Sequence, residues 1–141
     1  QTSIQAMNNQ ELNFLKLSYI SEEIFNQTKD KSIVNQCLIL KKEEYSQTFC
    51  EQKIKYIFAP NIKSLCQVMF KGNEELVEVY MPNVVKLEYA VFYYCDKLQH
   101  IYFPSLESIS MHTFTRCDSL TKVELPSLKN VKAIGFFKCQ S

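Results

Sequence analysis

The sequence repeats itself every 22 residues, and this period restricts the possible fold more than any other feature. The four prolines, Pro60, Pro82, Pro104 and Pro126, are separated by three equal steps of 22 residues. A unit this short cannot bury its own apolar side chains, so successive units have to stack on one another. The period therefore predicts a solenoid in which equivalent residues of neighbouring coils lie one above the other.

Other positions follow the same period between residues 60 and 139 without an insertion. Cysteines repeat at 95, 117 and 139, and Asn73 takes the equivalent position one repeat earlier. Large apolar residues form several further columns: Phe70, Phe92, Phe114 and Phe136; Leu76, Leu98 and Leu120; Val79, Ile101 and Val123; Ile62, Val84, Leu106 and Leu128; Leu65, Leu87, Ile109 and Val131. Every coil runs in the same direction, so the strands should form a parallel ladder with a spacing of about 4.8 Å.

Within one repeat, the alternation of apolar and polar residues identifies the strand. Ile101 and Phe103 are two residues apart and should point inward, whereas His100 and Tyr102 should point to the opposite side of the sheet. Proline lacks the N–H that continues a ladder, so Pro104 should end the strand. We expect the chain to turn inward again after each proline and to fill the coil with the repeated phenylalanine.

The pattern from Cys95 to Phe114, C-x-x-L-x-x-I-x-F-P-x-L-x-x-I-x-x-x-x-F, resembles the BspA-like class of leucine-rich repeats, also called the Treponema pallidum type. The copy that begins at Cys117 is equally similar, and the resemblance covers residues 54–141. It implies a right-handed leucine-rich-repeat superhelix, mainly β, with a parallel sheet on its concave face. For surface members of the class it also implies adhesion or attachment to a host matrix.

The first third of the chain is less regular. We predict irregular capping repeats over residues 1–53 and regular repeats over residues 54–141, about six coils in all. Ser21-Glu22-Glu23-Ile24 has the N-cap and the acidic first turn of a helix. Two groups of apolar residues match the regular spacing in part. The first group is Leu17, Ile20 and Phe25, which have the spacing of Leu106, Ile109 and Phe114. The second group is Leu38, Leu40 and Phe49, which match only if an insertion is allowed. The sequence ends within a repeat, so we expect an array that continues beyond Ser141 or an unusual cover at that edge.

Composition excludes several classes of function. Sixteen basic and 15 acidic residues give a net charge of +1, without the basic excess that a nucleic-acid binder needs. Two glycines among 141 residues cannot supply a glycine-rich phosphate loop. No run of 18 apolar residues is present, so we expect no membrane insertion. No targeting signal is visible, and both a cell-surface and a cytoplasmic location stay open.

The residue types used in catalysis and metal binding do not form a site in the sequence. The six cysteines are at least 13 residues apart and give no C-x-x-C pair, so we prefer a column of buried thiols to a disulfide framework or a zinc site. His100 and His112 should face different sides, with no nucleophile assignable to either. Glu78 and Glu124 should lie about 10 Å apart, and we interpret them as solvated carboxylates instead of a glycosidase pair. We therefore predict no enzyme activity, no cofactor and no metal.

The outward side of the strand ladder is the candidate site. One of its columns contains Tyr56, Glu78, His100 and Lys122, and the other contains Phe58, Tyr80, Tyr102 and Glu124. Exposed aromatic residues often mark partner sites, although strand propensity or a covering element would also explain them. We predict a non-catalytic scaffold that binds a protein partner through these eight residues. The alternatives are a structural repeat module and a substrate-recruiting domain of a longer protein.

Overall fold

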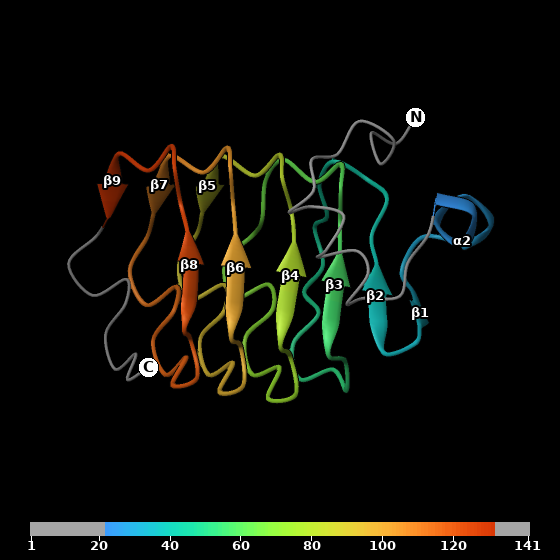
Figure 1. Ribbon diagram of the computed structural model, residues 1–141, viewed down its shortest axis with the longest axis horizontal. Helices are drawn as coiled ribbons and strands as arrows, with labels where there is room; N and C mark the ends of the chain where they lie inside the picture. Colours follow the sequence, from blue (N-terminus) through green and yellow to red (C-terminus); the bar gives the residue numbers. More distant parts are fainter. Residues whose placement is uncertain (1–21, 132–141) are drawn as a thin grey trace.

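The computed structural model describes residues 22–131 as a stack of parallel coils with a helix and a hairpin at one end (Figure 1). The helix is α2 (Glu22–Gln27), and the first two strands are β1 (Ser32–Val34) and β2 (Cys37–Ile39). The coils then contribute β3 (Tyr56–Phe58), β4 (Glu78–Tyr80), β6 (His100–Tyr102) and β8 (Lys122–Glu124) to the same sheet. A second sheet contains β5 (Lys86–Leu87), β7 (Ser108–Ile109) and β9 (Asn130–Val131).

The main sheet confirms the predicted register. The pairs β3–β4, β4–β6 and β6–β8 are parallel, and each joins residues that are 22 positions apart, as in Val79 with Ile101. The first coil is shorter, because Leu38 pairs with Ile57 across 19 residues. This pairing confirms the match proposed for Leu38 and locates the irregularity in the loop that follows β2.

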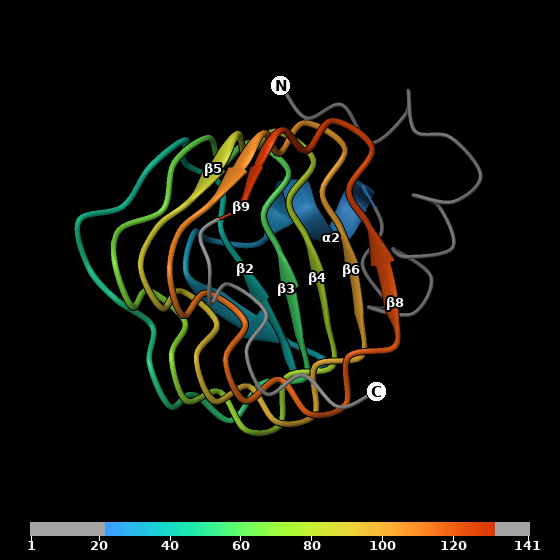
Figure 2. The ribbon, with the colours of Figure 1, turned by 90° about the vertical axis from the view of Figure 1, so that its left-hand side faces the viewer.

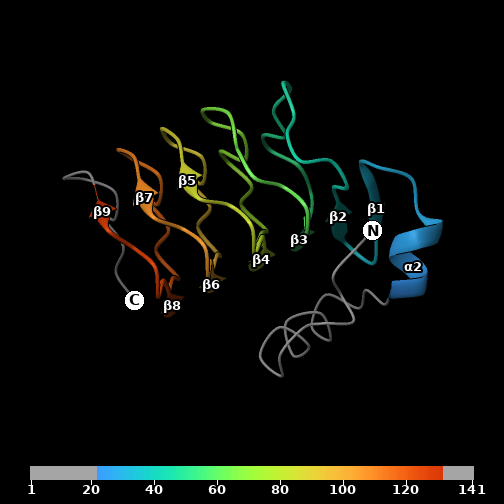
Figure 3. The same ribbon diagram turned by 90° about the horizontal axis from the view of Figure 1, so that it is seen from above.

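A second ladder follows the prolines. Strands β5, β7 and β9 pair in parallel and again join residues 22 positions apart, such as Leu87 and Ile109. Seen from above, the two sheets form two rows, and each coil passes from one row to the other (Figure 3). Each of the coils that contain β4, β6 and β8 therefore adds one strand to each sheet, whereas β2 and β3 have no counterpart in the second sheet of the described residues. Coils that stack in this way form a leucine-rich-repeat solenoid.

The repeated phenylalanines form a continuous stack inside the coils. The ring centroids of Phe49 and Phe70 are 5.9 Å apart, those of Phe70 and Phe92 are 5.6 Å apart, and those of Phe92 and Phe114 are 5.7 Å apart. All four rings are buried. Burying each ring contributes about 1.5–3 kcal/mol, and the stack confirms that like side chains meet between coils.

The cysteine column joins neighbouring coils through hydrogen bonds. The Sγ of Cys95 donates to the carbonyl oxygen of Phe70 at 3.4 Å, and the Sγ of Cys117 donates to that of Phe92 at 3.2 Å. In the same position one repeat earlier, Nδ2 of Asn73 donates to Phe49 at 2.9 Å. The five cysteines within the described range are free thiols, and of the predicted column Cys95 and Cys117 are buried, whereas Cys139 lies outside the described residues.

The N-terminal end of the described chain departs from the repeat. Strand β1 pairs with β2 in the antiparallel direction through a turn at Asn35 and Gln36, both with positive φ. The predicted helix is confirmed as α2, which carries Glu22 and Glu23 in its first turn. The predicted roles of Ser21, Leu17 and Ile20 lie outside the described residues.

The predicted equivalence of Phe25 and Phe114 is wrong. Phe25 lies on α2 and contacts Phe58 on the outer side of the main sheet, with ring centroids 5.5 Å apart and the rings nearly perpendicular. Phe114 belongs instead to the stack inside the coils. The similar spacing of the two phenylalanines is coincidental, because a helix occupies the segment in which a coil was expected.

Candidate protein-binding face

The predicted columns exist on the outer side of the main sheet, called here the strand face. Tyr56, Glu78, His100 and Lys122 are successive partners in the ladder, and so are Phe58, Tyr80, Tyr102 and Glu124. Viewed along the array, strands β2, β3, β4, β6 and β8 lie side by side and α2 lies next to them (Figure 2). The coil register therefore brings all eight predicted residues together on one surface.

Most of the first half of the strand face is buried, contrary to the prediction of an exposed aromatic row, and only Tyr56 in this half is partly exposed. The side chains of Phe58 and Tyr80 have relative exposures of 0% and 1%. Their rings stack on each other at 5.1 Å, and the edge of Phe25 meets Phe58. Together with Cys37 and Ile39, these three residues form a second hydrophobic cluster, separate from the core inside the coils.

The six-residue helix α2 brings Phe25 to this cluster. Phe25 is the buried residue of α2, and the ammonium of Lys41 lies 4.8 Å above its ring. Placing a cation above the face of an aromatic ring is favourable. Sequence periodicity could not reveal this cover, because neither Phe25 nor Lys41 belongs to a repeat column.

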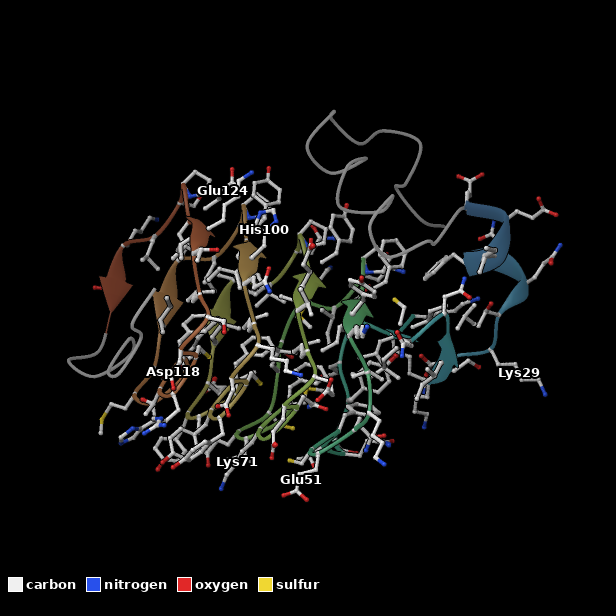
Figure 4. The ribbon with its side chains drawn as sticks, turned by 60° about the horizontal axis from the view of Figure 1, so that its bottom comes forward. Lys29, Glu51, Lys71, His100, Asp118 and Glu124 are labelled. Carbon is white, nitrogen blue, oxygen red and sulfur yellow. The ribbon has the colours of Figure 1, made fainter. Side chains whose placement is uncertain are left out.

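Glu78 is also buried, and it belongs to a group of three ionisable side chains from three adjacent strands. Nδ1 of His100 lies 3.5 Å from Oε2 of Glu78, and Nε2 of His100 lies 2.9 Å from Oε2 of Glu124. The carboxylate of Glu78 contributes most to raising the pKa of His100 above its ordinary value; burial opposes the shift, and Glu124 adds to it. Figure 4 shows His100 and Glu124 next to each other at the same edge of the molecule.

This group of three was only partly foreseeable from the sequence. The two glutamates were expected to be solvated carboxylates about 10 Å apart on flat strands. The structure instead lets both side chains reach toward the imidazole between them. Glu78 is the direct ladder partner of His100, whereas Glu124 is the diagonal neighbour on β8. Long side chains can reach a diagonal neighbour on the same face of a sheet. This rule could have predicted the contact between His100 and Glu124 from the sequence.

The second half of the strand face is more accessible. Lys122 is exposed, and Tyr102, His100 and Glu124 are each partly exposed. This half offers an ammonium, a phenol, an imidazole and a carboxylate on a rigid sheet. Such a set can form charge-assisted hydrogen bonds and apolar contacts with a protein surface.

A hollow adjoins the strand face at its N-terminal end. Asn35 and Gln36 from the hairpin turn and Lys55 and Tyr56 from the start of β3 line a pocket of about 450 Å³. The backbone N–H of Lys55 donates to the carbonyl oxygen of Gln36 at 2.8 Å, which fixes the turn against the next coil. Tyr56 therefore presents part of its side chain to this pocket, which the repeat columns did not predict.

Metal-binding groups and buried thiols were two candidate reactive features of the sequence. Among residues 22–131, no three His, Cys, Asp or Glu side chains are arranged to hold a metal ion. Burial raises the pKa of Cys37 and of Cys95 to about 12, so both thiols are protonated near neutral pH. The described part of the chain also contains no helix long and apolar enough to cross a membrane.

Comparison with known proteins gives one match. The family model for the BspA type leucine rich repeat region matches residues 3–99 and 42–141, with six copies. No curated protein and no solved structure matches the chain. The two matched ranges together extend over nearly the whole sequence, including the first third that the sequence columns described poorly.

Proposed function

Because the chain belongs to the BspA-type leucine-rich repeat family, we propose that it is a non-catalytic scaffold that binds a protein partner through the strand face. Proteins of this family provide a repeat framework suited to protein interaction. The observation that supports a site here is the accessible half of the strand face, formed by His100, Tyr102, Lys122 and Glu124. These side chains come from two neighbouring strands and are held in a fixed register.

The proposed mechanism is recognition by a surface formed before binding. The strands are tied to neighbouring coils by parallel ladders, so little backbone entropy is lost when a partner binds. Tyr102 would supply apolar contact area with a hydrogen-bonding hydroxyl, a combination enriched at binding hot spots. Lys122 and Glu124 would supply charges at the rim, which orient a partner more than they add affinity.

The burial of Phe58, Tyr80 and Glu78 narrows the proposed surface. These three residues support the strand face and are not part of the surface that a partner would contact. Tyr56 lies at the boundary between the strand face and the neighbouring pocket. Attachment to a host matrix, as in surface members of the class, would be one use of such a face. A structural repeat module and a substrate-recruiting domain are the alternatives, and the first of these needs no partner at the strand face.

Site-directed crosslinking tests the proposal. A photoreactive amino acid is placed at Lys122 on the strand face or at Lys29, an exposed residue next to α2, in the full 141-residue chain. We expect a protein from the native source to crosslink at position 122 and not at position 29. Unlabelled parent protein should compete for this crosslink, and a Tyr102→Ser/Lys122→Glu variant should need about tenfold more protein to do so.

The matched control is Lys29→Glu, which makes the same charge change away from the strand face. It should compete as well as the parent. Equal competition by the Tyr102→Ser/Lys122→Glu variant, with its melting temperature unchanged, would contradict a binding role for this half of the face. It would favour the structural module instead.

A further inference from the structure

A group of exposed and partly exposed side chains, most of them aromatic, lies on the turns that lead from β5 to β6 and from β7 to β8. Its members, called here the ridge patch, are Tyr89, Tyr93, Tyr94, Met111 and His112, with Lys71 and Arg116 beside them. Tyr89, Tyr94 and Met111 are 44%, 42% and 45% exposed, and they make up half of the large exposed hydrophobic residues in the described chain. No aromatic residue of the strand face has comparable exposure.

The ridge patch is separate from the strand face. Figure 4 shows Lys71 and Asp118, which neighbour the patch, along one edge of the molecule, whereas His100 and Glu124 lie along the opposite edge. The patch spans two successive coils, because Tyr89–Tyr94 belongs to one repeat and Met111–Arg116 belongs to the next. A partner at the ridge would therefore leave the strand face free.

The rings of the ridge patch already support one another. The centroids of Tyr93 and Tyr94 are 4.6 Å apart, and the ring of His112 lies 5.9 Å from Tyr93 and 5.7 Å from Tyr89, all in edge-to-face arrangements. Nδ1 of His112 is also 3.2 Å from the hydroxyl of Thr115. Such contacts fix the rings in place, so that a partner meets an ordered aromatic surface and loses less entropy on binding.

Two cations lie over these rings, and only one of them has an ion-pair partner among the described residues. The ammonium of Lys71 is 5.5 Å from the ring centre of Tyr93, and Lys71 forms no ion pair within residues 22–131. The guanidinium of Arg116 is 5.6 Å from the ring centre of Tyr94. One of its terminal nitrogens pairs with Asp118 at 3.4 Å, and its buried Nε has no hydrogen-bond acceptor among residues 22–131.

The backbone also presents these side chains at unusual positions. Gly72, Tyr94 and Arg116 are equivalent residues of successive coils, and all have positive φ, 73°, 60° and 65°. Glycine suits this conformation best, and a side chain there costs about 1–2 kcal/mol. Positive φ also recurs at Val68, Ala90 and His112, so it belongs to the repeated geometry of these turns, and Tyr94 and Arg116 occupy positions that glycine would fill at less cost.

We propose that the ridge patch is a second protein-binding surface, and that it receives a peptide segment with an aromatic side chain flanked by acidic residues. The aromatic side chain would pack on Tyr89, Tyr94 and Met111. The carboxylates would pair with Lys71, which is exposed, and with Arg116, whose side chain is 41% exposed. The composition fits, because tyrosine, methionine and arginine are enriched at protein interfaces.

Three synthetic peptides provide the test. Each is a capped pentapeptide with a central phenylalanine. The two residues on each side of it are glutamates in the first peptide, glutamines in the second and lysines in the third. Each is titrated into the isotope-labelled full-length chain and followed by amide chemical shifts in NMR. We expect the glutamate peptide to shift the signals of Tyr93, Tyr94 and Arg116 and to bind about tenfold more tightly than the glutamine peptide, with the lysine peptide weakest.

Asparagine tolerates positive φ better than most residues, so it provides variants that should fold. Tyr94→Asn should weaken all three peptides, whereas Lys71→Gln/Arg116→Asn should remove the preference for glutamate and leave the phenylalanine contact. Ile33→Ser, at an exposed apolar residue on β1, is the control and should bind like the parent. Thermal melting verifies that each variant is folded.

Four outcomes would overturn the inference. Equal affinity for the glutamate and lysine peptides, or the absence of shifts at the ridge, would remove the acidic segment as the occupant. Concentration-dependent broadening of the ridge signals without peptide would identify a second copy of the chain as the occupant instead. Peptide shifts confined to His100, Tyr102 and Lys122 would contradict the ridge proposal while supporting the strand face.

Discussion

Two aromatic columns run along the array, one inside the coils and one on the outer side of the main sheet, and they are buried by different means. The inner column, Phe49, Phe70, Phe92 and Phe114, is covered by the coils themselves, and each ring stacks on equivalents from neighbouring coils. The outer column begins with Phe58, Tyr80 and Tyr102, and its first two rings are buried in a cluster that includes Phe25 of α2. The comparison shows that the repeat determines what lies inside the solenoid, whereas a non-repeated element determines how much of the outside is accessible.

The largest expected effect tests the inner column. Phe92→Ala should lower the free energy of unfolding by about 3–5 kcal/mol, because it removes a buried ring and leaves a cavity. The ring of Phe92 contacts Phe70, Phe103 and Phe114, so three neighbours lose packing at once. Urea denaturation followed by circular dichroism measures the change. A loss below about 1 kcal/mol would mean that the coils do not depend on the stack, and Tyr89→Ala, at a largely exposed ring, serves as the control.

An intermediate effect tests the outer column. Phe25→Ala and Phe58→Ala should each destabilise the fold, and the double variant should lose less than the sum of the two. The difference should be about 0.5–1.5 kcal/mol, the usual value for an edge-to-face aromatic pair. A double-mutant cycle in urea measures this coupling. Strict additivity would mean that α2 does not stabilise the strand face through Phe25.

The smallest expected effect concerns His100 at the boundary between the covered and accessible halves of the face. Its pKa is raised in the folded protein, so folding favours the protonated imidazole. The resulting stabilisation is complete below the unfolded pKa of about 6.5. It is lost as the pH rises through the higher folded pKa. The free energy of unfolding should therefore fall over this window in the parent and change less in His100→Gln.

Urea denaturation at several pH values between about 5.5 and 8.5 measures this dependence, in a range where free carboxylates stay ionised. His112→Asn is the matched control, because it removes the other histidine at a position with positive φ. It should keep the pH dependence of the parent. If His100→Gln keeps it as well, the contacts with Glu78 and Glu124 do not contribute to stability.

The sequence was sufficient for everything that depends on equivalent positions in neighbouring coils. The register of the ladders, the phenylalanine stack and the exchange of Asn73 for a cysteine all follow from the 22-residue step. The coil between Leu38 and Ile57 was recognisable despite its length of 19 residues. In each case a side chain is buried against its own equivalents, so that the pattern carries the structural information.

The sequence was insufficient where a surface depends on elements outside the repeat. Phe25 has a spacing that imitates a coil, yet it belongs to a helix, and only the structure shows that it meets Phe58. The repeat pattern does not single out Tyr93 and Tyr94, because neither shares a column with another aromatic residue. Their exposure and their contacts with Lys71 and Arg116 follow from turn geometry, which the periodicity does not encode.

The antiparallel hairpin at β1 makes one end of the main sheet different from the other. Strand β1 occupies the side of β2 where another parallel coil would otherwise attach, and it runs in the opposite direction. Within the described sheet, gene duplication can thus lengthen the array by inserting coils between β2 and β8 without disturbing this terminus. Each inserted unit would also add one pair of residues to the strand face, so the recognition surface and the length of the array would evolve together.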